Sequence, residues 1–272
     1  MLNSRMKFLS LIFPLAMASS FLGVSSPEPG NLPLTAAGFD CNFSPLATAV
    51  PQKNTEAITL ESVLKKMDAV AATFRTAQAE FEWQNYQKVI DEVVDVETGS
   101  IYYRRSGKDV DMMANVKKIG ASTKDLKPEP KYVLFSDGKV KMYSPKTDQV
   151  TVYDLGKNRA DWESYIVLGF GGSGQDLQKT FDVTLAGTED INGVTTAKLE
   201  LIPKSEKVRR NYNRMILWID PNTGIAVRQQ FFTPQGDYRL STYSSIRLNE
   251  KINDDVFKLK TTSKTQTISP TG

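Results

Sequence analysis

The chain has 272 residues, of which 40% are hydrophobic and 24% charged, a composition typical of a globular protein with a sizeable core. It contains no His and a single Cys, which excludes Ser-His and Cys-His nucleophiles, metal sites built from His or Cys clusters, and intramolecular disulfides. The net charge of +3 is too small to indicate binding to nucleic acid. We therefore expect a binding or structural protein rather than an enzyme, with no metal and no cofactor.

The first 26 residues have the layout of a secretory signal peptide. Arg5 and Lys7 precede an apolar run, Phe8–Ala18, and small residues suitable for cleavage follow. An uncleaved membrane anchor is the alternative, but the run is shorter than the roughly 20 residues that a spanning helix needs, and Pro14 interrupts it. The sequence predicts export and cleavage of residues 1–26.

Residues 27–56 contain five prolines and show no hydrophobic period, which predicts a flexible linker. Cys41 lies in this linker, and Asp40 before it does not fit a lipidation signal, so we interpret Cys41 as a lone thiol. Order begins near residue 58, where apolar residues at helical spacing predict a helix that starts at Leu60 and is capped by Thr59. Residues 261–272 are predicted to be a flexible tail.

From Phe81 onward the pattern changes to short alternating runs between turn residues, which predicts about ten consecutive antiparallel strands. Near the start, strands are predicted at Val89–Val96 and Ser100–Arg105, with a turn at Thr98-Gly99 between them. The polar residues Ser106–Lys131 are predicted to form an extended loop. The predicted fold is mainly β (α+β): a curved antiparallel sheet forming an incomplete barrel, with an N-terminal helix and a short helical lid over an apolar cavity.

A glycine-rich segment interrupts the strands. Gly169, Gly171 and Gly174 satisfy G-x-G-x-x-G, but residues 175–179 are too few for the crossover helix of a dinucleotide-binding unit. A purely structural connection would have little use for so many glycines, so we interpret them as a hinge for the apolar segment before them. The expected lid residues are Trp162, Tyr165, Ile166, Leu168 and Phe170.

Alternation assigns a set of apolar side chains to the concave face of the sheet, where they are expected to line the cavity. A packed core is the alternative interpretation of the same residues. The expected lining residues are Phe81, Trp83, Val133, Phe135, Val140, Met142, Val150, Val152, Leu199, Leu201, Leu217 and Phe231.

Charged side chains gather at two places. Alternation places Asp91, Asp95 and Glu97 on one strand face, and residues 204–210 form a basic loop. The carboxylates could form a glycosidase pair only with a defined separation and a raised pKa, which the sequence does not give, so we interpret them as a solvated strand face. The basic loop could contact an anionic head group or a membrane surface; we interpret it as a solvated hairpin tip.

Five short motifs occur in an order and spacing that resemble a known family over residues 57–260. They are the helix Leu60–Phe74 leading into Ala79–Trp83, the segment Gly99–Arg105, the turn Phe135–Lys139, the segment Met142–Pro145 followed by Val150, and the closing Asp254–Leu259. They resemble the LolA-like family of periplasmic outer-membrane lipoprotein-sorting proteins. The resemblance implies a half-barrel whose lid encloses a cavity for the acyl chains of lipoproteins.

The resemblance also implies a latch, because Arg104 or Arg105 occupies the place of an arginine that bonds to lid backbone in this family; Ser106 stands where a proline usually follows. We therefore expect a monomeric periplasmic carrier for lipoprotein acyl chains or another lipid, with inner- and outer-membrane transfer partners and no nucleic acid. One alternative is an envelope-stress regulator or protein-interaction module of the same fold without a transported lipid. The other is an enzyme that uses the glycine loop.

Overall fold

The computed structural model describes residues 57–107, 109–156 and 165–270; the predictions for residues 1–56 and for Trp162 lie outside this part of the chain. The helices are α2 (Leu60–Thr73), α4 (Gly174–Thr180), α5 (Glu206–Arg209) and the 3-10 helix η3 (Asp254–Phe257). The strands are β1 (Thr76–Gln87), β2 (Glu92–Ser106), β3 (Asp109–Gly120), β4 (Lys127–Ser136), β5 (Lys139–Ser144), β6 (Gln149–Asp154), β7 (Phe181–Ile191), β8 (Val194–Pro203), β9 (Arg214–Asp220), β10 (Ile225–Phe232), β11 (Tyr238–Leu248) and β12 (Gln266–Ile268).

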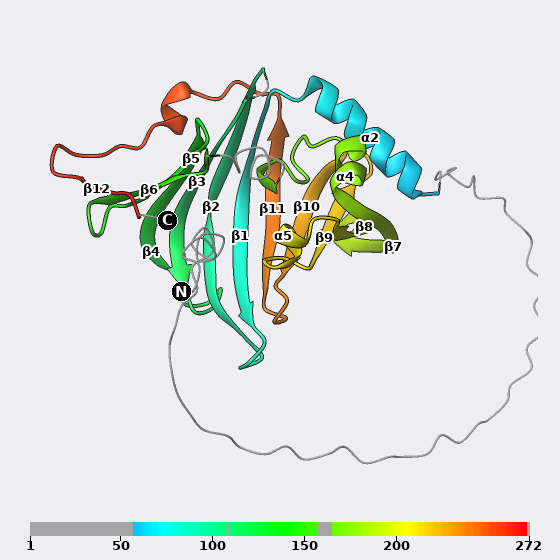
Figure 1. Ribbon diagram of the computed structural model, residues 1–272, viewed down its shortest axis with the longest axis horizontal. Helices are drawn as coiled ribbons and strands as arrows, with labels where there is room; N and C mark the ends of the chain where they lie inside the picture. Colours follow the sequence, from blue (N-terminus) through cyan, green and yellow to red (C-terminus); the bar gives the residue numbers. More distant parts are fainter. Residues whose placement is uncertain (1–56, 108, 157–164, 271–272) are drawn as a thin grey trace, which may run out of the picture.

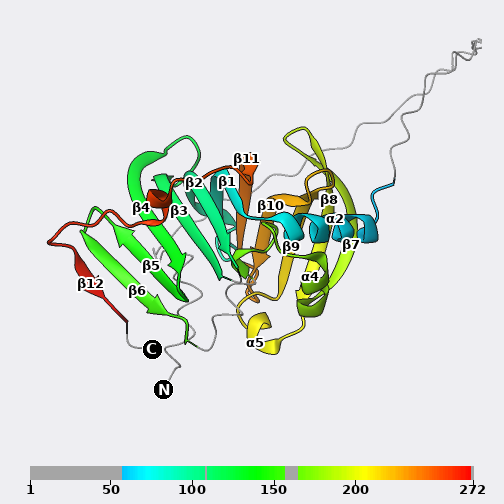
Figure 2. The same ribbon diagram turned by 90° about the horizontal axis from the view of Figure 1, so that it is seen from above.

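All twelve described strands belong to one sheet, in the order β12-β6-β5-β4-β3-β2-β1-β11-β10-β9-β8-β7 (Figure 1). Every neighbouring pair is antiparallel except β12 and β6, which are parallel. Figure 2 shows the sheet curved, with its two edges apart and with α2 and α4 against the β7–β10 half. The predicted fold class, an open curved sheet with covering helices, is confirmed.

Helix α2 begins where the sequence predicts. The Thr59 side chain accepts a hydrogen bond from the Ser62 backbone, and the Ser62 side chain accepts one from the Thr59 backbone. This capping box satisfies two of the amide groups that a helix start leaves without partners. The apolar face of the helix packs on the sheet through its buried residues Val63, Leu64 and Met67.

The first hairpin differs from the prediction. Strand β2 runs without a break from Glu92 to Ser106, and its connection to β1 is a turn at residues 88–91. The predicted strand at Val89–Val96 therefore begins three residues too early, and Thr98-Gly99 is not a turn. Gly99 lies inside β2. This position requires a glycine because a Cβ atom there would come within 2.0 Å of the Asn115 carbonyl oxygen on β3. Close approach of two backbones, not chain reversal, requires this glycine.

The predicted loop Ser106–Lys131 contains β3. Alternation fails to reveal this strand because both of its faces are covered. Met113 packs against Phe257 of η3 on the convex side, whereas Ala114 belongs to the concave core. The polar tail likewise contains β12, whose three exposed residues pair with β6.

The concave face carries two clusters of buried side chains. The first lies over β1–β6 and the second over β7–β10 beneath α2 and α4. A smaller cluster on the convex side joins β3 and β4 to η3. The sheet therefore has one main covered face, and the segments that cover it determine what can reach it.

Gly99→Ala should destabilise the protein by about 1–3 kcal/mol, because the added methyl group overlaps the Asn115 carbonyl group. Urea unfolding followed by circular dichroism measures the change, and Ser106→Ala at the exposed end of the same strand is the control. Equal stability of Gly99→Ala and the parent protein would contradict the close approach.

Candidate functional site

The segment that precedes α4 lies on the concave face and inserts an aromatic ring into it. Phe170 has 0% of its surface exposed. Its ring stacks on Tyr103 of β2 at a centroid distance of 4.9 Å and meets Tyr243 of β11 edge-on at 4.7 Å. Burial raises the pKa of both tyrosines above its ordinary value. Phe170 thus fills an aromatic slot in the middle of the sheet.

Polar side chains and backbone of the sheet hold the same segment. Gln229 on β10 donates from Nε2 to the Leu168 carbonyl oxygen at 2.5 Å and accepts a hydrogen bond from the Tyr243 hydroxyl at 3.1 Å. The Ala226 amide donates to the Gly169 carbonyl oxygen at 2.9 Å. Gln229 is buried, and no motif singles it out in the sequence. The available signal is a polar residue two positions before Phe231, on the face that alternation assigns to the core.

Arg105 joins this segment to α2. Its guanidinium donates from Nη1 to the Ala71 carbonyl oxygen at 3.1 Å and from Nη2 to the Gly171 carbonyl oxygen at 2.9 Å. It also lies 5.2 Å from the centre of the Phe74 ring, and partial burial lowers its pKa. Arg105 therefore links α2 to the backbone directly after the lid residue Phe170, and its role as a latch stays a prediction.

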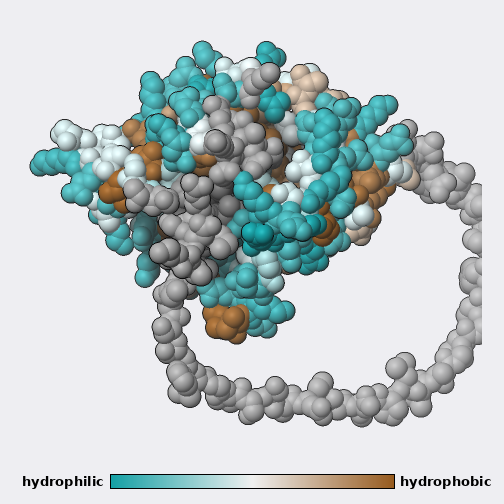
Figure 3. Space-filling model, viewed as in Figure 1, coloured by the Kyte–Doolittle hydropathy of each residue, from teal (hydrophilic) through white to brown (hydrophobic). Residues whose placement is uncertain are grey.

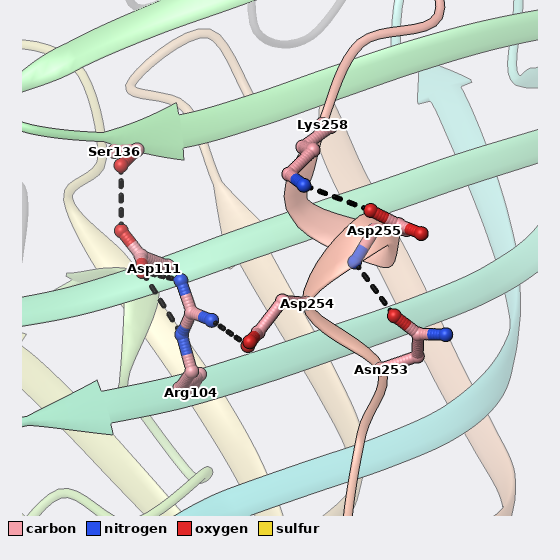
Figure 4. A network of polar contacts seen from close by, with 7 residues as sticks. All are labelled: Arg104, Asp111, Ser136, Asn253, Asp254, Asp255 and Lys258. Atoms are coloured by element: carbon pink, nitrogen blue, oxygen red, sulfur yellow. Dashed lines mark hydrogen bonds and ion pairs between the residues drawn. The ribbon is translucent and has the colours of Figure 1, made fainter.

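Arg104 lies on the other face, because successive strand residues point to opposite sides of a sheet. Figure 4 shows its guanidinium between Asp111 of β3 and Asp254 of η3, at 2.7 Å and 2.6 Å, with Ser136 bonded to Asp111. It also stacks over Phe257 at 4.4 Å. Arg104 thus holds the C-terminal segment on the convex side, and the side-chain bonds that it makes to the described residues do not reach the lid.

The glycines of this segment have packing roles. A Cβ atom at Gly169 would lie 2.6 Å from the Ala226 side chain, and one at Gly171 would lie 2.5 Å from the Phe74 ring. Both residues have positive φ, at 77° and 79°. The expectation that a structural connection has little use for these glycines is therefore wrong: backbone close to the sheet and to α2 requires them. Their role as a hinge stays a prediction.

The lid residues within the described chain bridge the two concave clusters. Tyr165 and Leu168 pack with the cluster beneath α2, whereas Ile166 and Phe170 pack with the cluster over β1–β6. The lid therefore contacts both halves of the concave face.

The structure divides the expected lining residues into three groups. One group packs over β1–β6: Phe81, Val133, Phe135 and Val140, with Trp83 and Met142 partly buried beside them. A second group is packed beneath α2 and α4, as a filled core: Leu199, Leu201, Leu217 and Phe231.

The third group, Val150 and Val152, lies on the convex face. Thr151 pairs with Met142 and Tyr153 pairs with Val140, so these two β6 residues share the concave side and their neighbours do not. Their placement in the predicted lining is wrong by one residue, because Val-Thr-Val-Tyr has a β-branched residue at every position but one and shows no alternation. That the first group contacts a ligand stays a prediction.

The solvated face predicted for three carboxylates holds for Asp91, which lies in the exposed turn before β2, but Asp95 is half-buried and Glu97 is buried. Glu97 is 2% exposed on the concave side and accepts a hydrogen bond from Lys131 Nζ at 2.5 Å. Arg239 Nη2 lies 3.9 Å from the other Glu97 oxygen, and the Arg239 guanidinium lies 4.0 Å from the Trp83 ring centre. Burial raises the pKa of Asp95 two residues away. An ionic cluster thus lies beside the aromatic residues at this end of the concave face, and net charge alone gives no sign of it.

Removing the carboxylate should show how much this cluster contributes. Glu97→Ala removes the buried carboxylate that pairs with Lys131 and Arg239 and should cost about 3–5 kcal/mol of unfolding free energy. Glu129→Ala is the control, because its ion pair with Lys146 is exposed and should contribute less than about 1 kcal/mol. Chemical denaturation measures both, and equal losses would contradict a buried ionic cluster.

No helix in the described part of the chain is long and apolar enough to cross a membrane. The sequence model of one protein family, described as "Uncharacterized protein", matches residues 134–255, which is less than half of the chain. A search of curated proteins finds no match.

Several solved structures are similar to this chain. An uncharacterized conserved protein from Thermus thermophilus is 11% identical, with a TM-score of 0.48 over 77% of this chain and 98% of that one. MucB is 12% identical, with a TM-score of 0.45 over 74% of this chain, which spans only 62% of MucB. The LolA superfamily protein NE2245 from Nitrosomonas europaea is 13% identical, with a TM-score of 0.34 over 75% of this chain and 99% of that one. LolA superfamily proteins are thus among the structures that this chain resembles. At these identities and TM-scores the likeness assigns it no function.

Proposed function

We propose that this chain is a non-enzymatic periplasmic carrier that binds an acyl chain, of a lipoprotein or another lipid, on the concave face of its open sheet. The observation that carries the proposal is the place of Phe170. A side chain from a connecting segment occupies an apolar slot between Tyr103 and Tyr243, and polar contacts around the slot hold that segment in place. A hydrocarbon chain that displaced Phe170 would meet the same aromatic walls.

The energies of closure and of binding are of comparable size, as a reversible carrier requires. Each hydrogen bond from a charged donor such as Arg105 contributes roughly 1.5–3 kcal/mol, and burial of Phe170 contributes roughly as much. An acyl chain gains about 0.8 kcal/mol per buried methylene group, so about ten groups supply about 8 kcal/mol. A long acyl chain therefore outweighs the closing contacts, whereas a short one does not.

The closing contacts belong to two elements that can separate without unfolding the sheet. Arg105 bonds to backbone oxygens of α2 and of the glycine segment, and Gln229 bonds to Leu168 in that segment. All of these acceptors lie outside the sheet, whose own strands pair with one another. Opening then breaks these side-chain contacts and the bond from the Ala226 amide to the Gly169 carbonyl oxygen, and leaves the strand pairing intact.

Fluorescence of bis-ANS, with palmitate as the competitor, tests the proposal on three proteins. The parent should bind the dye and release it to palmitate. Arg105→Leu loses the donor to Ala71 and Gly171 and should bind at least tenfold more tightly, since the loss of even one of its two charged hydrogen bonds removes roughly 1.5–3 kcal/mol of closing energy. Arg104→Leu is the matched control, because the bonds and the ring contact described for Arg104 lie on the convex side; its affinity should equal that of the parent.

Each other outcome has a definite meaning. If no variant binds dye or palmitate while circular dichroism shows all three folded, the chain is no acyl carrier, and the interaction module of the same fold replaces it. If Arg104→Leu and Arg105→Leu change affinity equally, Arg105 is not the latch.

A further inference from the structure

The hairpin between β1 and β2 ends in two exposed aliphatic side chains. Its turn reads Lys88-Val89-Ile90-Asp91, with Val89 94% exposed and Ile90 52% exposed. Only one other large hydrophobic residue in the described ranges is exposed, Ile268 at 41%. Figure 3 shows a brown protrusion at the lower end of the molecule, at the tip of this hairpin in Figure 1, with hydrophilic surface above it.

These residue types are unusual for the position. Turn residues are normally polar, with Gly, Asn, Asp and Ser the commonest, and they favour water. The positive φ of this turn falls on Asp91, at 54°, so the apolar character of Val89 and Ile90, and not their backbone, is what is unusual. Val89 and Ile90 are β-branched and apolar, and the fold gains no burial from them. A residue that departs from the usual preference of its position, and that does not stabilise the fold in exchange, is expected to serve a function.

The tip is held rigidly away from the rest of the protein. The Tyr86 hydroxyl donates a hydrogen bond to the Asp91 carboxylate across the turn. The Lys88 amide donates to Asp237 Oδ1 at 2.9 Å, which ties the turn to the neighbouring β10–β11 connection. Tyr86 also stacks on Tyr238 at a centroid distance of 4.4 Å. The two aliphatic side chains are thus presented outward, with little entropy left to lose on binding.

The shape of the tip favours a bilayer over a protein partner. A stable protein interface needs about 800 Å² from each side, whereas two adjacent side chains on a convex tip offer a small fraction of that area. A bilayer accepts single apolar side chains and holds tyrosines at its polar boundary, where Tyr86 and Tyr238 would lie. Asp91, Glu92 and Asp237 outnumber Lys88 at the tip, so anionic lipid would not attract it.

We propose that Val89 and Ile90 insert into the surface of an electrically neutral lipid bilayer and so dock this protein on a membrane. Docking is driven by apolar burial, and raised salt leaves it unchanged. The hairpin tip is at the opposite end of β2 from Arg105, so the latch and the lid stay clear of the bilayer. This contact is independent of the proposed acyl site.

A local fluorescent label tests the proposal on the full chain carrying Cys41→Ser. Val89→Cys and Ile268→Cys variants are each labelled with the environment-sensitive dye NBD and mixed with phosphatidylcholine vesicles. The emission of the label at position 89 should shift to the blue and be quenched by nitroxide-labelled lipid, equally at low and high salt. The label at position 268, on another exposed apolar residue, should do neither.

A local label also separates this contact from membrane attachment through residues 1–26, which both variants share. A second measurement uses unlabelled protein: Val89→Ser with Ile90→Ser should weaken vesicle partitioning at least tenfold relative to Ile268→Ser, with bis-ANS binding unchanged. Emission at position 89 that stays aqueous on vesicles would overturn the proposal. So would a blue shift that appears without vesicles and grows with protein concentration, because it would identify a second copy of the chain as the occupant.

Discussion

An open sheet would leave its concave apolar face in water unless other segments covered it. Helices α2 and α4, the glycine segment and the contacts that hold them in place all serve to cover that face. A closed barrel would bury it, but here the edge strands β7 and β12 lie apart. Helices α2 and α4 cover the half formed by β7–β10. Phe170 covers the centre by lying between Tyr103 and Tyr243, so the chain uses one of its own side chains where a ligand of similar cross-section would fit.

Two neighbouring arginines of β2, Arg104 and Arg105, each hold a different covering segment against the sheet. Alternation along β2 points Arg105 to the concave side, where it bonds to α2 and to Gly171, and points Arg104 to the convex side, where it bonds to Asp111 and Asp254. One contact belongs to the lid and the other to the C-terminal segment that leads to β12. The two arginines therefore hold two different covering segments, one on each face of the sheet.

The sequence was enough to predict the start of α2 and the curved antiparallel sheet, and it placed an arginine beside the glycine segment, whose role as a latch stays a prediction. The alternation of apolar and polar residues predicts a strand and its faces only where one face is buried and the other is exposed, and some strands of this sheet do not meet that condition. Strand β3 is covered on both faces and shows no alternation, and Val150 and Val152 lie in a run with an apolar or β-branched residue at nearly every position. Glycines were misread because a glycine can indicate a turn, a hinge or close packing. Gly99 and Gly171 are required by close packing against neighbouring atoms. The sequence did not reveal that Gln229 and Glu97 are buried, because burial of a polar group depends on strands distant in sequence.

Hydrogen exchange on the unmodified protein, with and without palmitate, shows most directly whether a ligand replaces Phe170. Palmitate should speed exchange at the amides of residues 168–172 and at Ala226, whose amide bonds to Gly169, and should leave β1, β2 and β11 protected. Exchange that is identical in the two conditions would show that Phe170 is a fixed part of the core. Faster exchange across the whole sheet would show that the cover cannot open without unfolding the strands beneath it.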